Sequence, residues 1–567
     1  MTAGSTENSW EEIIHRNSVW IVVALAVAAS LSGITNGFAF DDVRAVAEDS
    51  RIHSLPALWH VFTETYWLPK YGASLYRPLT SLGFGLQWAI GNGSPLVFHI
   101  VSIAAYAGVC AAMLGLAKQI FDNSTALIGT AIFAVHPLHV EAVANVVGQA
   151  ELGAALLVII AVSKYVKWSR IGGIGARDTI ILCAMYAGAL MFKEHAIVLP
   201  ALLMATELLP SGDSASTVKR VSRRWPLLVA MAIAGAAFVV IRAVVIGKIT
   251  GGGDQAGVFI GQGFGVRLLT MLPVVLEWIR LFVWPAGLSA DYSSPRIDIA
   301  TSFHATMLPA VAIIIAVVAI AVYVRKESPA TTFAFAWSGI ALLIPSNLIV
   351  VTGFVLAERA LFLPSVGVSM LMGVAITATL RYASPSMRRL VVAGAAALIV
   401  AGIARSSFRN PVWKDNESLF RQTVEDVPYS WKSHLMLGEL LVGQGKGEGI
   451  LEMSLGVKLA PKNDVQVRYV TARRLHVSKQ QAAALPFYAE ALALEPANPQ
   501  IREDLAYCLA QMGRMDDAIL VAKGGLRLKP GDFRLERFMK YADSTAKVLP
   551  AVAALSTTAA PIAPNAN

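Results

Sequence analysis

Eleven apolar segments in the first 405 residues constrain the fold of this chain more than any other feature. They lie at 19–37, 98–117, 124–140, 151–166, 178–192, 195–210, 226–246, 304–324, 330–350, 360–380 and 390–405. A helix needs about 20 apolar residues to cross a hydrocarbon core about 30 Å thick. Because lipid offers no hydrogen-bond partners to the backbone, such segments are expected to be helical. The sequence therefore predicts an all-α, polytopic membrane domain of about 11 spans.

Charged residues divide the chain into two parts. Residues 1–404 hold 47 of them, whereas the shorter stretch 405–547 holds 38. This contrast predicts a cytoplasmic N-terminal segment at 1–18, a membrane domain at 19–405, a water-exposed domain at 406–548 and a disordered Ala/Pro-rich tail at 549–567. The net charge of +9 is spread over both main parts, so no nucleic-acid partner is expected.

Lysine and arginine residues indicate how the membrane domain is oriented. With the N-terminus in the cytoplasm, the predicted cytoplasmic loops hold 15 of the 26 Lys and Arg residues of 1–404, as the positive-inside rule expects. Eleven crossings then place 406–548 outside the cytoplasm. Residues 77–91 and 266–285 are interpreted as helices lying in the outer interface, since 77–91 is short and 266–285 carries three charges and two Trp. If 266–285 crossed the membrane instead, the C-terminal domain would be cytoplasmic.

Prolines recur at Pro461, Pro496 and Pro530, which are spaced by 35 and 34 residues. This is the period of tetratricopeptide repeats, whose paired helices approach at small residues. Two units match the repeat pattern well and an earlier one is degenerate. The region is therefore predicted to form a short tetratricopeptide-repeat solenoid, which either binds a protein partner or packs against the membrane domain.

Ionisable residues gather at the predicted outer ends of the spans, where such groups are costly to desolvate and are often functional. Asp41 and Asp42 follow the first span directly. Adjacent carboxylates suit a divalent cation or a general base, and they also suit the start of a helix. Arg77, Lys193 and Arg359 are candidate ligands for a phosphate, although Lys193 could instead extend from a helix end towards water.

A second polar group follows the third predicted span. His136, His139 and Glu141 surround Pro137, which could turn the chain so that two or three side chains meet. Asp42, His139 and Glu141 are the candidate ligands of a divalent cation, and the alternative is a hydrogen-bonded interfacial loop without metal. Further candidates for the outer site, in the same order along the chain, are Glu151, Glu194, Asp291 and Tyr292.

The order of several segments is more specific than any one of them. FAFDDV, YRPLTSL, FAVHPLHVEAVANVVGQAEL, MFKEHAIVLPALL, LAERALFLPSVG and RNPVWKDNESLF follow one another ahead of the repeats. In this order the chain resembles the transmembrane and tetratricopeptide-repeat (TMTC-type) protein O-mannosyltransferases of the GT-C glycosyltransferase superfamily. The resemblance implies a multi-pass enzyme of the bacterial inner membrane or the endoplasmic reticulum. It would transfer a sugar, mannose or another hexose, from a polyprenyl-phosphate carrier to a Ser/Thr or other hydroxyl on the extracytoplasmic face.

The resemblance also implies roles for individual residues. Asp41 or Asp42 would be the base or a metal-binding group, with Glu141 and Glu151 as further acidic catalytic candidates. The candidates for binding the substrates are Arg77, His136, His139, Lys193, Glu194, Asp291, Tyr292 and Arg359. The carrier would be dolichyl or undecaprenyl phosphate, and the repeats would bind a protein acceptor or partner.

Two departures from the family pattern leave the acceptor and the identity of the sugar open. The repeat array is short, and the usual GRAE reads GQAE, with Gln149 in place of a cation. A catalytically silent membrane scaffold whose repeats recruit partners is the main alternative. A transporter is disfavoured, because it should carry its polar residues at mid-membrane rather than at the ends of its spans.

Overall fold

A computed structural model describes residues 3–72, 74–171, 173–210, 216–248, 259, 261–292 and 297–557. The chain forms two compact units, Met1–Asp426 and Val427–Asn567. Every regular element in the described ranges is helical, so the predicted all-α class is confirmed.

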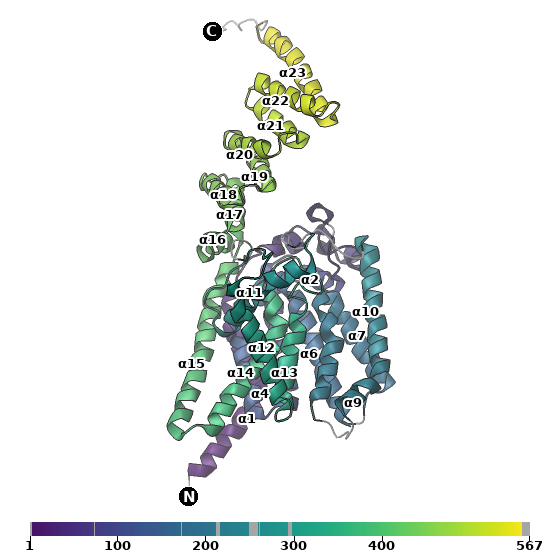
Figure 1. Cartoon of the computed structure of the whole chain (residues 1–567), viewed down its shortest axis with the longest axis vertical. Coiled ribbons are helices and arrows are strands. Elements are labelled where there is room, and N and C mark those ends of the chain that lie inside the picture. Colours follow the sequence, from purple (N-terminus) through teal and green to yellow (C-terminus); the bar gives the residue numbers. More distant parts are fainter. Residues whose placement is uncertain are drawn as a thin grey trace, which may run out of the picture. The chain divides into compact units, whose positions relative to one another are not determined.

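The first unit is a bundle of helices joined by turns and by longer segments with 3-10 helices, such as the one between α1 and α2 (Figure 1). Its α-helices are α1 (Ala3–Ser30), α2 (Pro78–Gly91), α3 (Pro95–Ile120), α4 (Asn123–Val135), α5 (Val140–Ala144), α6 (Gln149–Ile171), α7 (Ala176–Phe192), α8 (Leu199–Ala205), α9 (Thr217–Arg223), α10 (Trp225–Ile246), α11 (Phe264–Val283), α12 (Leu308–Val324), α13 (Pro329–Leu342), α14 (Phe362–Tyr382), α15 (Pro385–Arg409) and α16 (Asn416–Asp426).

Seven helices of the described residues are long and apolar enough to cross a membrane. They contain α1, α3, α6, α10, α12, α14 and α15, and α4 with the segment Pro137–Ala144 forms a bent pair that makes an eighth candidate. A multi-pass membrane unit is therefore confirmed, and eight of the 11 predicted spans correspond to these candidates of the described residues. The other three predicted segments form shorter helices. They form α7 with 17 residues, α8 with 7 and α13 with 14.

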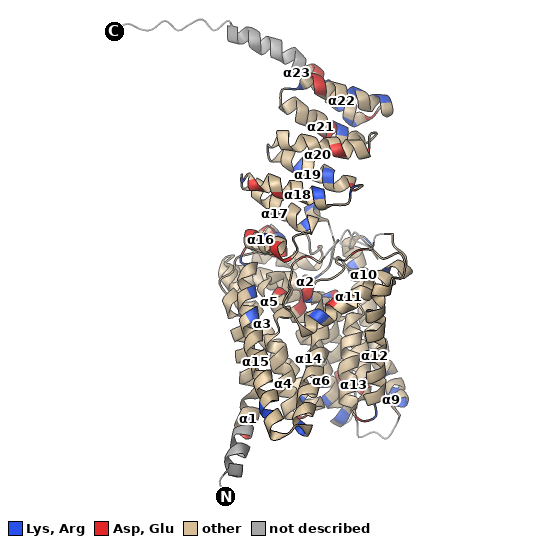
Figure 2. Ribbon diagram, turned by 60° about the vertical axis from the view of Figure 1, so that its left-hand side comes forward, with Lys and Arg blue, Asp and Glu red and all other residues tan. Residues whose placement is uncertain are grey.

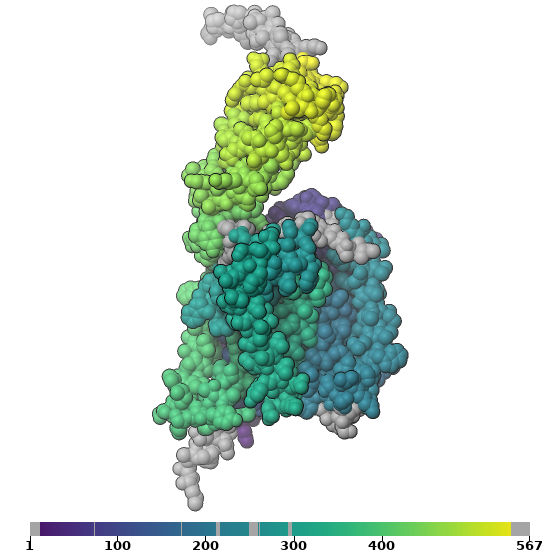
Figure 3. Space-filling view, in the orientation of Figure 1, coloured from purple at the N-terminus to yellow at the C-terminus, as the bar shows by residue number. Residues whose placement is uncertain are grey.

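Several of these helices present apolar side chains on the outside of the bundle. Exposed residues include Ile233 on α10, Ile315 and Tyr323 on α12, and Leu390 and Leu398 on α15. Figure 3 shows one flank of the bundle, on which atoms of α10 and α12 form part of the surface. Such a surface suits lipid, which solvates apolar side chains as well as a protein interior does. Helices α2 and α11 are not among the seven candidate spans.

Small residues bring the inner helices together. A Cβ atom added to Gly129 on α4 would lie 2.8 Å from the carbonyl oxygen of Ser369 on α14, and one added to Gly373 would lie 2.7 Å from the Thr125 carbonyl oxygen. The two backbones therefore touch, and only glycine fits at the contact. This contact lies within one large apolar core that α1, α3, α4, α6, α7, α8, α10, α13 and α14 share.

The second unit consists of helix pairs followed by a final helix. The pairs are α17 (Trp431–Gly443) with α18 (Glu448–Leu459), α19 (Val465–Val477) with α20 (Gln481–Leu494), and α21 (Pro499–Gln511) with α22 (Met515–Leu528), and α23 spans Phe533–Thr557. Pro461, Pro496 and Pro530 each lie between two pairs or before α23, as the repeat period predicts. In the degenerate first pair, a Cβ on Gly449 would approach the Gly438 carbonyl oxygen to 2.6 Å, so glycines permit the close packing of α17 on α18.

The boundaries of the parts differ from the predicted ones. The units divide after Asp426 rather than near residue 405, because α16 packs beside the turn Asn410–Trp413 and Asp426 pairs with buried Arg409 at 2.7 Å. At the N-terminus, α1 begins at Ala3 and continues through the predicted segment 1–18. At the other end α23 continues through Thr557, so part of the tail predicted to be disordered is helical, and 558–567 lie outside the described residues.

Candidate functional site

The candidate site is built where helices stop short. Pro137 has no N–H to donate, and it ends α4 by forcing His136 into an extended conformation. Lys193 is likewise extended, with φ −157° and ψ 139°, and ends α7. Because the chain leaves the helical path at both positions, polar side chains of several segments meet at one end of the bundle.

Asp41 and Asp42 lie next to each other but have different surroundings. The Asp41 carboxylate accepts a hydrogen bond from Arg359 at 2.9 Å and is partly exposed. Asp42 is buried and accepts the backbone N–H groups of Val146 and Val147 at 2.9 and 2.8 Å. Burial raises the pKa of Asp42 to about 7, although these two hydrogen bonds oppose the shift. Asp42 therefore fixes the turn before α6, and Asp41 is the more accessible carboxylate.

Three buried or partly buried ion-pair groups surround this corner. Arg359 also approaches Glu141, whose carboxylate accepts the Arg359 backbone N–H at 2.8 Å. Lys193 donates to Glu151. Arg77 donates through two nitrogens to Glu194, at 3.0 and 3.1 Å.

Electrostatic interactions connect these groups into one assembly. Glu141 interacts with Lys193, Lys193 with Arg359, and Arg77 with Glu151. We call the set the charged cluster; its members are Asp41, Arg77, Glu141, Glu151, Lys193, Glu194 and Arg359. Acidic and basic residues are seen together near the labels of α2, α5 and α11 (Figure 2).

The two histidines have protein partners of their own. His136 lies within 2.9 Å of the Phe282 carbonyl oxygen. His139 contacts the Tyr106 hydroxyl through Nδ1 and the Ser365 hydroxyl through Nε2, both at 2.9 Å. Within the described ranges no three His, Cys, Asp or Glu side chains are grouped so as to hold a metal ion. Asp42, His139 and Glu141 do not fit a metal site in this arrangement, since each binds a different protein group.

The remaining predicted residues lie in a neighbouring network. Tyr292 is buried, and its hydroxyl donates to Glu358 at 2.6 Å. Glu358 also accepts the Ser289 backbone N–H at 2.6 Å and interacts electrostatically with Glu141. Asp291 donates its backbone N–H to the Ser289 hydroxyl at 3.2 Å. This network fixes the loop after α11 beside the charged cluster.

Sequence reasoning missed two residues that belong to the site. Phe40 has φ 54°, which is unusual for a residue other than glycine, and its N–H donates to the Asn416 side chain at 2.5 Å. Asn416 lies in RNPVWKDNESLF, a segment that supported the resemblance but suggested no contact. Tyr66 interacts with Asp41, Asp42, Arg77 and Arg359, although it lies in an aromatic stretch without a charged spacing pattern.

The fold and the site together define a multi-pass helical membrane protein with a tetratricopeptide-repeat unit and a buried charged cluster at one end of its bundle. A family model described as a tetratricopeptide repeat matches residues 478–539.

Comparison with known proteins extends this similarity to most of the chain. Protein O-mannosyl-transferase F38B6.6 of Caenorhabditis elegans is 26% identical over 434 residues, which cover 75% of this chain and 60% of that protein. Protein O-mannosyl-transferase Tmtc3 of Drosophila melanogaster is 23% identical over 573 residues, covering 88% and 61%. Protein O-mannosyl-transferase TMTC4 of Homo sapiens is 24% identical over 478 residues, covering 75% and 64%. The chain thus resembles the TMTC-type proteins, as predicted, and spans about three fifths of the length of these relatives.

Proposed function

We propose that this protein is a membrane glycosyltransferase that moves a sugar from a polyprenyl-phosphate carrier to a hydroxyl group of an acceptor. Its relatives are named protein O-mannosyl-transferases, which favours mannose or another hexose as the sugar and a protein Ser or Thr as the acceptor. The observation that carries the proposal is the charged cluster, because it combines an accessible carboxylate with three cations at one end of a membrane bundle.

Asp41 is the proposed general base. Its carboxylate is partly exposed and can accept a proton from an acceptor hydroxyl, whereas both oxygens of Asp42 accept backbone N–H groups. A base must reach the proton that it removes. Arg359 orients the Asp41 carboxylate through the 2.9 Å contact, and Glu141 in turn holds the Arg359 backbone.

The reaction balances with groups present in the chain. The acceptor oxygen forms a bond to the anomeric carbon of the sugar while its proton passes to Asp41. The bond between that carbon and the phosphate oxygen breaks, and its electron pair leaves with the polyprenyl phosphate. Lys193 and Arg77 lie in the cluster as cations that can neutralise the charge gained by the leaving phosphate.

Activity assays with purified protein test this proposal. With a polyprenyl-phosphate-mannose donor and a Ser/Thr-containing peptide, we expect wild-type protein to form glycopeptide and Asp41→Asn to lose at least about 100-fold of the rate, as expected for loss of a general base. Glu48→Gln is the matched control, since Glu48 is an exposed acid of the same outer segment that pairs with Lys70. If the wild-type protein forms glycopeptide and the Asp41→Asn variant is equally active, the role of Asp41 as the general base is refuted.

A catalytically silent scaffold is the second candidate, and it is favoured by the pairing of all three cations with carboxylates. A scaffold would show no turnover with any polyprenyl-phosphate-sugar, yet its repeats would still retain partners. Deleting the protein and measuring which glycans are lost separates the two functions. For an enzyme, wild-type protein should restore these glycans and Asp41→Asn should not.

The proposed reaction takes place on the extracytoplasmic face, where the repeat unit would meet protein acceptors. Lys540→Cys, introduced on α23, reports the side of that unit. We expect labelling by a membrane-impermeant maleimide in intact cells or sealed vesicles of known orientation. If the introduced cysteine is labelled only when the reagent can reach the cytoplasmic side, the repeat unit is cytoplasmic and the proposed orientation is wrong.

A further inference from the structure

Tyr66 carries a buried hydroxyl group without a hydrogen-bond partner among the described residues. The residue is 4% exposed, and the Arg77 guanidinium lies 5.3 Å from the centre of its ring. A buried hydroxyl without a partner is costly, so native proteins rarely retain one without a reason. Its location suggests that the missing partner is a bound molecule.

The electrostatic surroundings of Tyr66 are those of the charged cluster. Asp41, Asp42, Arg77 and Arg359 all act on the phenol group. Burial raises the pKa of Tyr66, which keeps the hydroxyl protonated and able to donate. The cations of the cluster already have carboxylate partners, whereas this donor is still available to a ligand.

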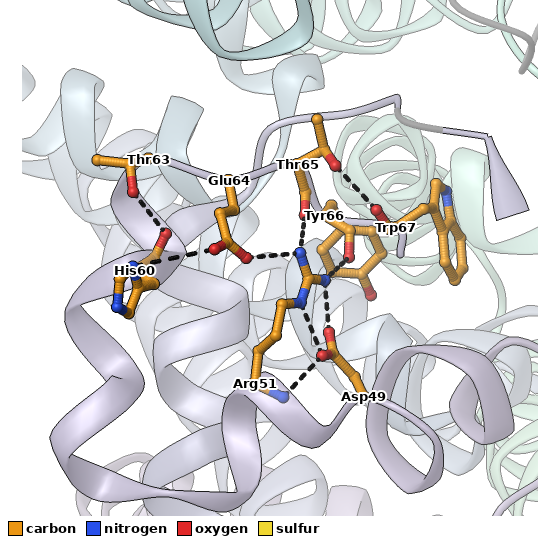
Figure 4. Close-up of polar contacts among 8 residues, drawn as sticks. All are labelled: Asp49, Arg51, His60, Thr63, Glu64, Thr65, Tyr66 and Trp67. Atoms are coloured by element: carbon orange, nitrogen blue, oxygen red, sulfur yellow. Dashed lines mark hydrogen bonds and ion pairs between the residues drawn. The ribbon is translucent and has the colours of Figure 1, made fainter. Parts of the chain in front are cut away.

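A rigid network holds Tyr66 in place (Figure 4). The Arg51 side chain donates to both carboxylate oxygens of Asp49 at 2.7 and 2.6 Å and to Glu64 at 3.1 Å. It also donates to the carbonyl oxygens of Thr65 at 3.0 Å and Tyr66 at 3.2 Å. All five N–H groups of the guanidinium are thus used.

The backbone of Tyr66 is fixed from a second side as well, because its N–H donates to the Leu75 carbonyl oxygen at 3.0 Å. The backbone that carries the phenol is therefore held at two points and the ring is buried, which limits how far the hydroxyl can move before a ligand arrives.

We propose that the Tyr66 hydroxyl donates a hydrogen bond to a phosphate oxygen of the polyprenyl-phosphate carrier. A phosphate oxygen suits this location because it is an anionic acceptor, and the Arg77 guanidinium over the ring and Arg359 nearby favour an anion beside the phenol. The inference rests on the proposed function, since it names a further residue that contacts the same donor.

Binding of a sugar-free polyprenyl monophosphate to purified protein in nanodiscs tests this contact. We expect Tyr66→Phe to raise the Kd by about 10- to 100-fold, because a hydrogen bond to a charged oxygen is lost. The melting temperature should not fall, since the removed hydroxyl has no protein partner. Tyr76→Phe is the matched control: Tyr76 is equally buried, but its hydroxyl donates to the Phe62 carbonyl oxygen at 2.9 Å, and its loss should leave the Kd unchanged.

Each outcome identifies what fails. If wild-type protein binds the lipid phosphate and Tyr66→Phe binds it equally well, the Tyr66 contact is wrong and the proposed function stands. If wild-type protein does not bind polyprenyl monophosphate or use it as a sugar carrier, the proposed function itself fails. Should Tyr66→Phe not fold, Arg51→Lys serves instead: lysine cannot make five such hydrogen bonds, so we expect weaker binding, and wild-type affinity would overturn the inference.

Discussion

Replacing Asp42 by alanine should destabilise the protein far more than replacing its neighbour Asp41. In the Asp42→Ala variant the N–H groups of Val146 and Val147 lose both acceptors, and these two residues are 0% and 6% exposed. A buried donor left without a partner costs about 1–3 kcal/mol, so the pair costs about 2–6 kcal/mol. This is a large part of a typical stability of about 5–15 kcal/mol.

Asp41→Asn should have a much smaller effect on stability. Asp41 is partly exposed, and its partner Arg359 keeps Glu141 as a second carboxylate. Solvent weakens such a pair to about 0–1 kcal/mol. The same variant should nevertheless abolish sugar transfer, because it removes the proposed base.

The two effects are measured together on protein purified in the same detergent. Melting temperature reports stability, and glycopeptide formation reports function, with Glu48→Gln as the common control. We expect Asp42→Ala to melt well below wild type, and Asp41→Asn to melt near it without turnover. If Asp42→Ala melts like wild type, the structural role of Asp42 is refuted. If Asp41→Asn unfolds instead of losing turnover, the chemical role of Asp41 is refuted.

Three further predictions follow from named contacts. The pKa of Asp42 is about 7 in the folded protein against a usual 3.8, so the native state binds more protons than the unfolded state over this range. The stability of the protein should therefore fall as the pH rises from about 4 to 7 and then level off. If the difference in melting temperature between wild type and Asp42→Asn does not change with pH, this prediction is wrong. Lys193→Met should lower the stability by about 3–5 kcal/mol, because it leaves Glu151 buried and charged without its partner. Adding Glu151→Gln should recover part of the lost melting temperature. A double variant that is no more stable than Lys193→Met would argue against this ion pair. Asn416→Ala should lower kcat more than it raises KM, because it releases the Phe40 backbone from the Asn416 side chain. The loss of kcat should be smaller when Phe40 is also replaced by glycine, which adopts φ 54° without strain. Equal losses of kcat with Phe40 and with glycine at that position would contradict this explanation.

Much of the fold could be predicted from the sequence because its signals are local. Apolar length and proline spacing are properties of short windows, and they led to the helical membrane unit and to the repeat pairs. Helix lengths were harder to predict than helix number, because hydropathy does not reveal where a helix stops. Lys193, whose side chain pairs with Glu151, ends α7, and Pro137 bends the path of α4.

The site was harder to predict because its contacts are long-range. The cations and carboxylates were chosen one at a time, and the sequence could not show that Arg359 meets Asp41 across 318 positions or that Arg77 meets Glu194 across 117. Tyr66 could not be chosen at all, since nothing in its neighbourhood distinguishes a buried phenol in a site from one in a core. Such residues become visible only when the unsatisfied polar groups of the folded chain are considered.

The pairing of the cations bears directly on the proposed chemistry. A polyprenyl-phosphate-sugar carries one negative charge on its phosphodiester, and the leaving polyprenyl phosphate carries up to two, so the reaction needs positive charge that grows as the bond breaks. When Asp41 takes the acceptor proton, it loses the charge that neutralises Arg359. The guanidinium keeps its single positive charge and Glu141 as a partner, but it is less neutralised as the phosphate becomes more negative, so the stabilisation is stronger in the transition state than in the ground state. A cation that is paired in the resting protein is therefore compatible with catalysis, as Arg359 is when its partner Asp41 accepts the proton.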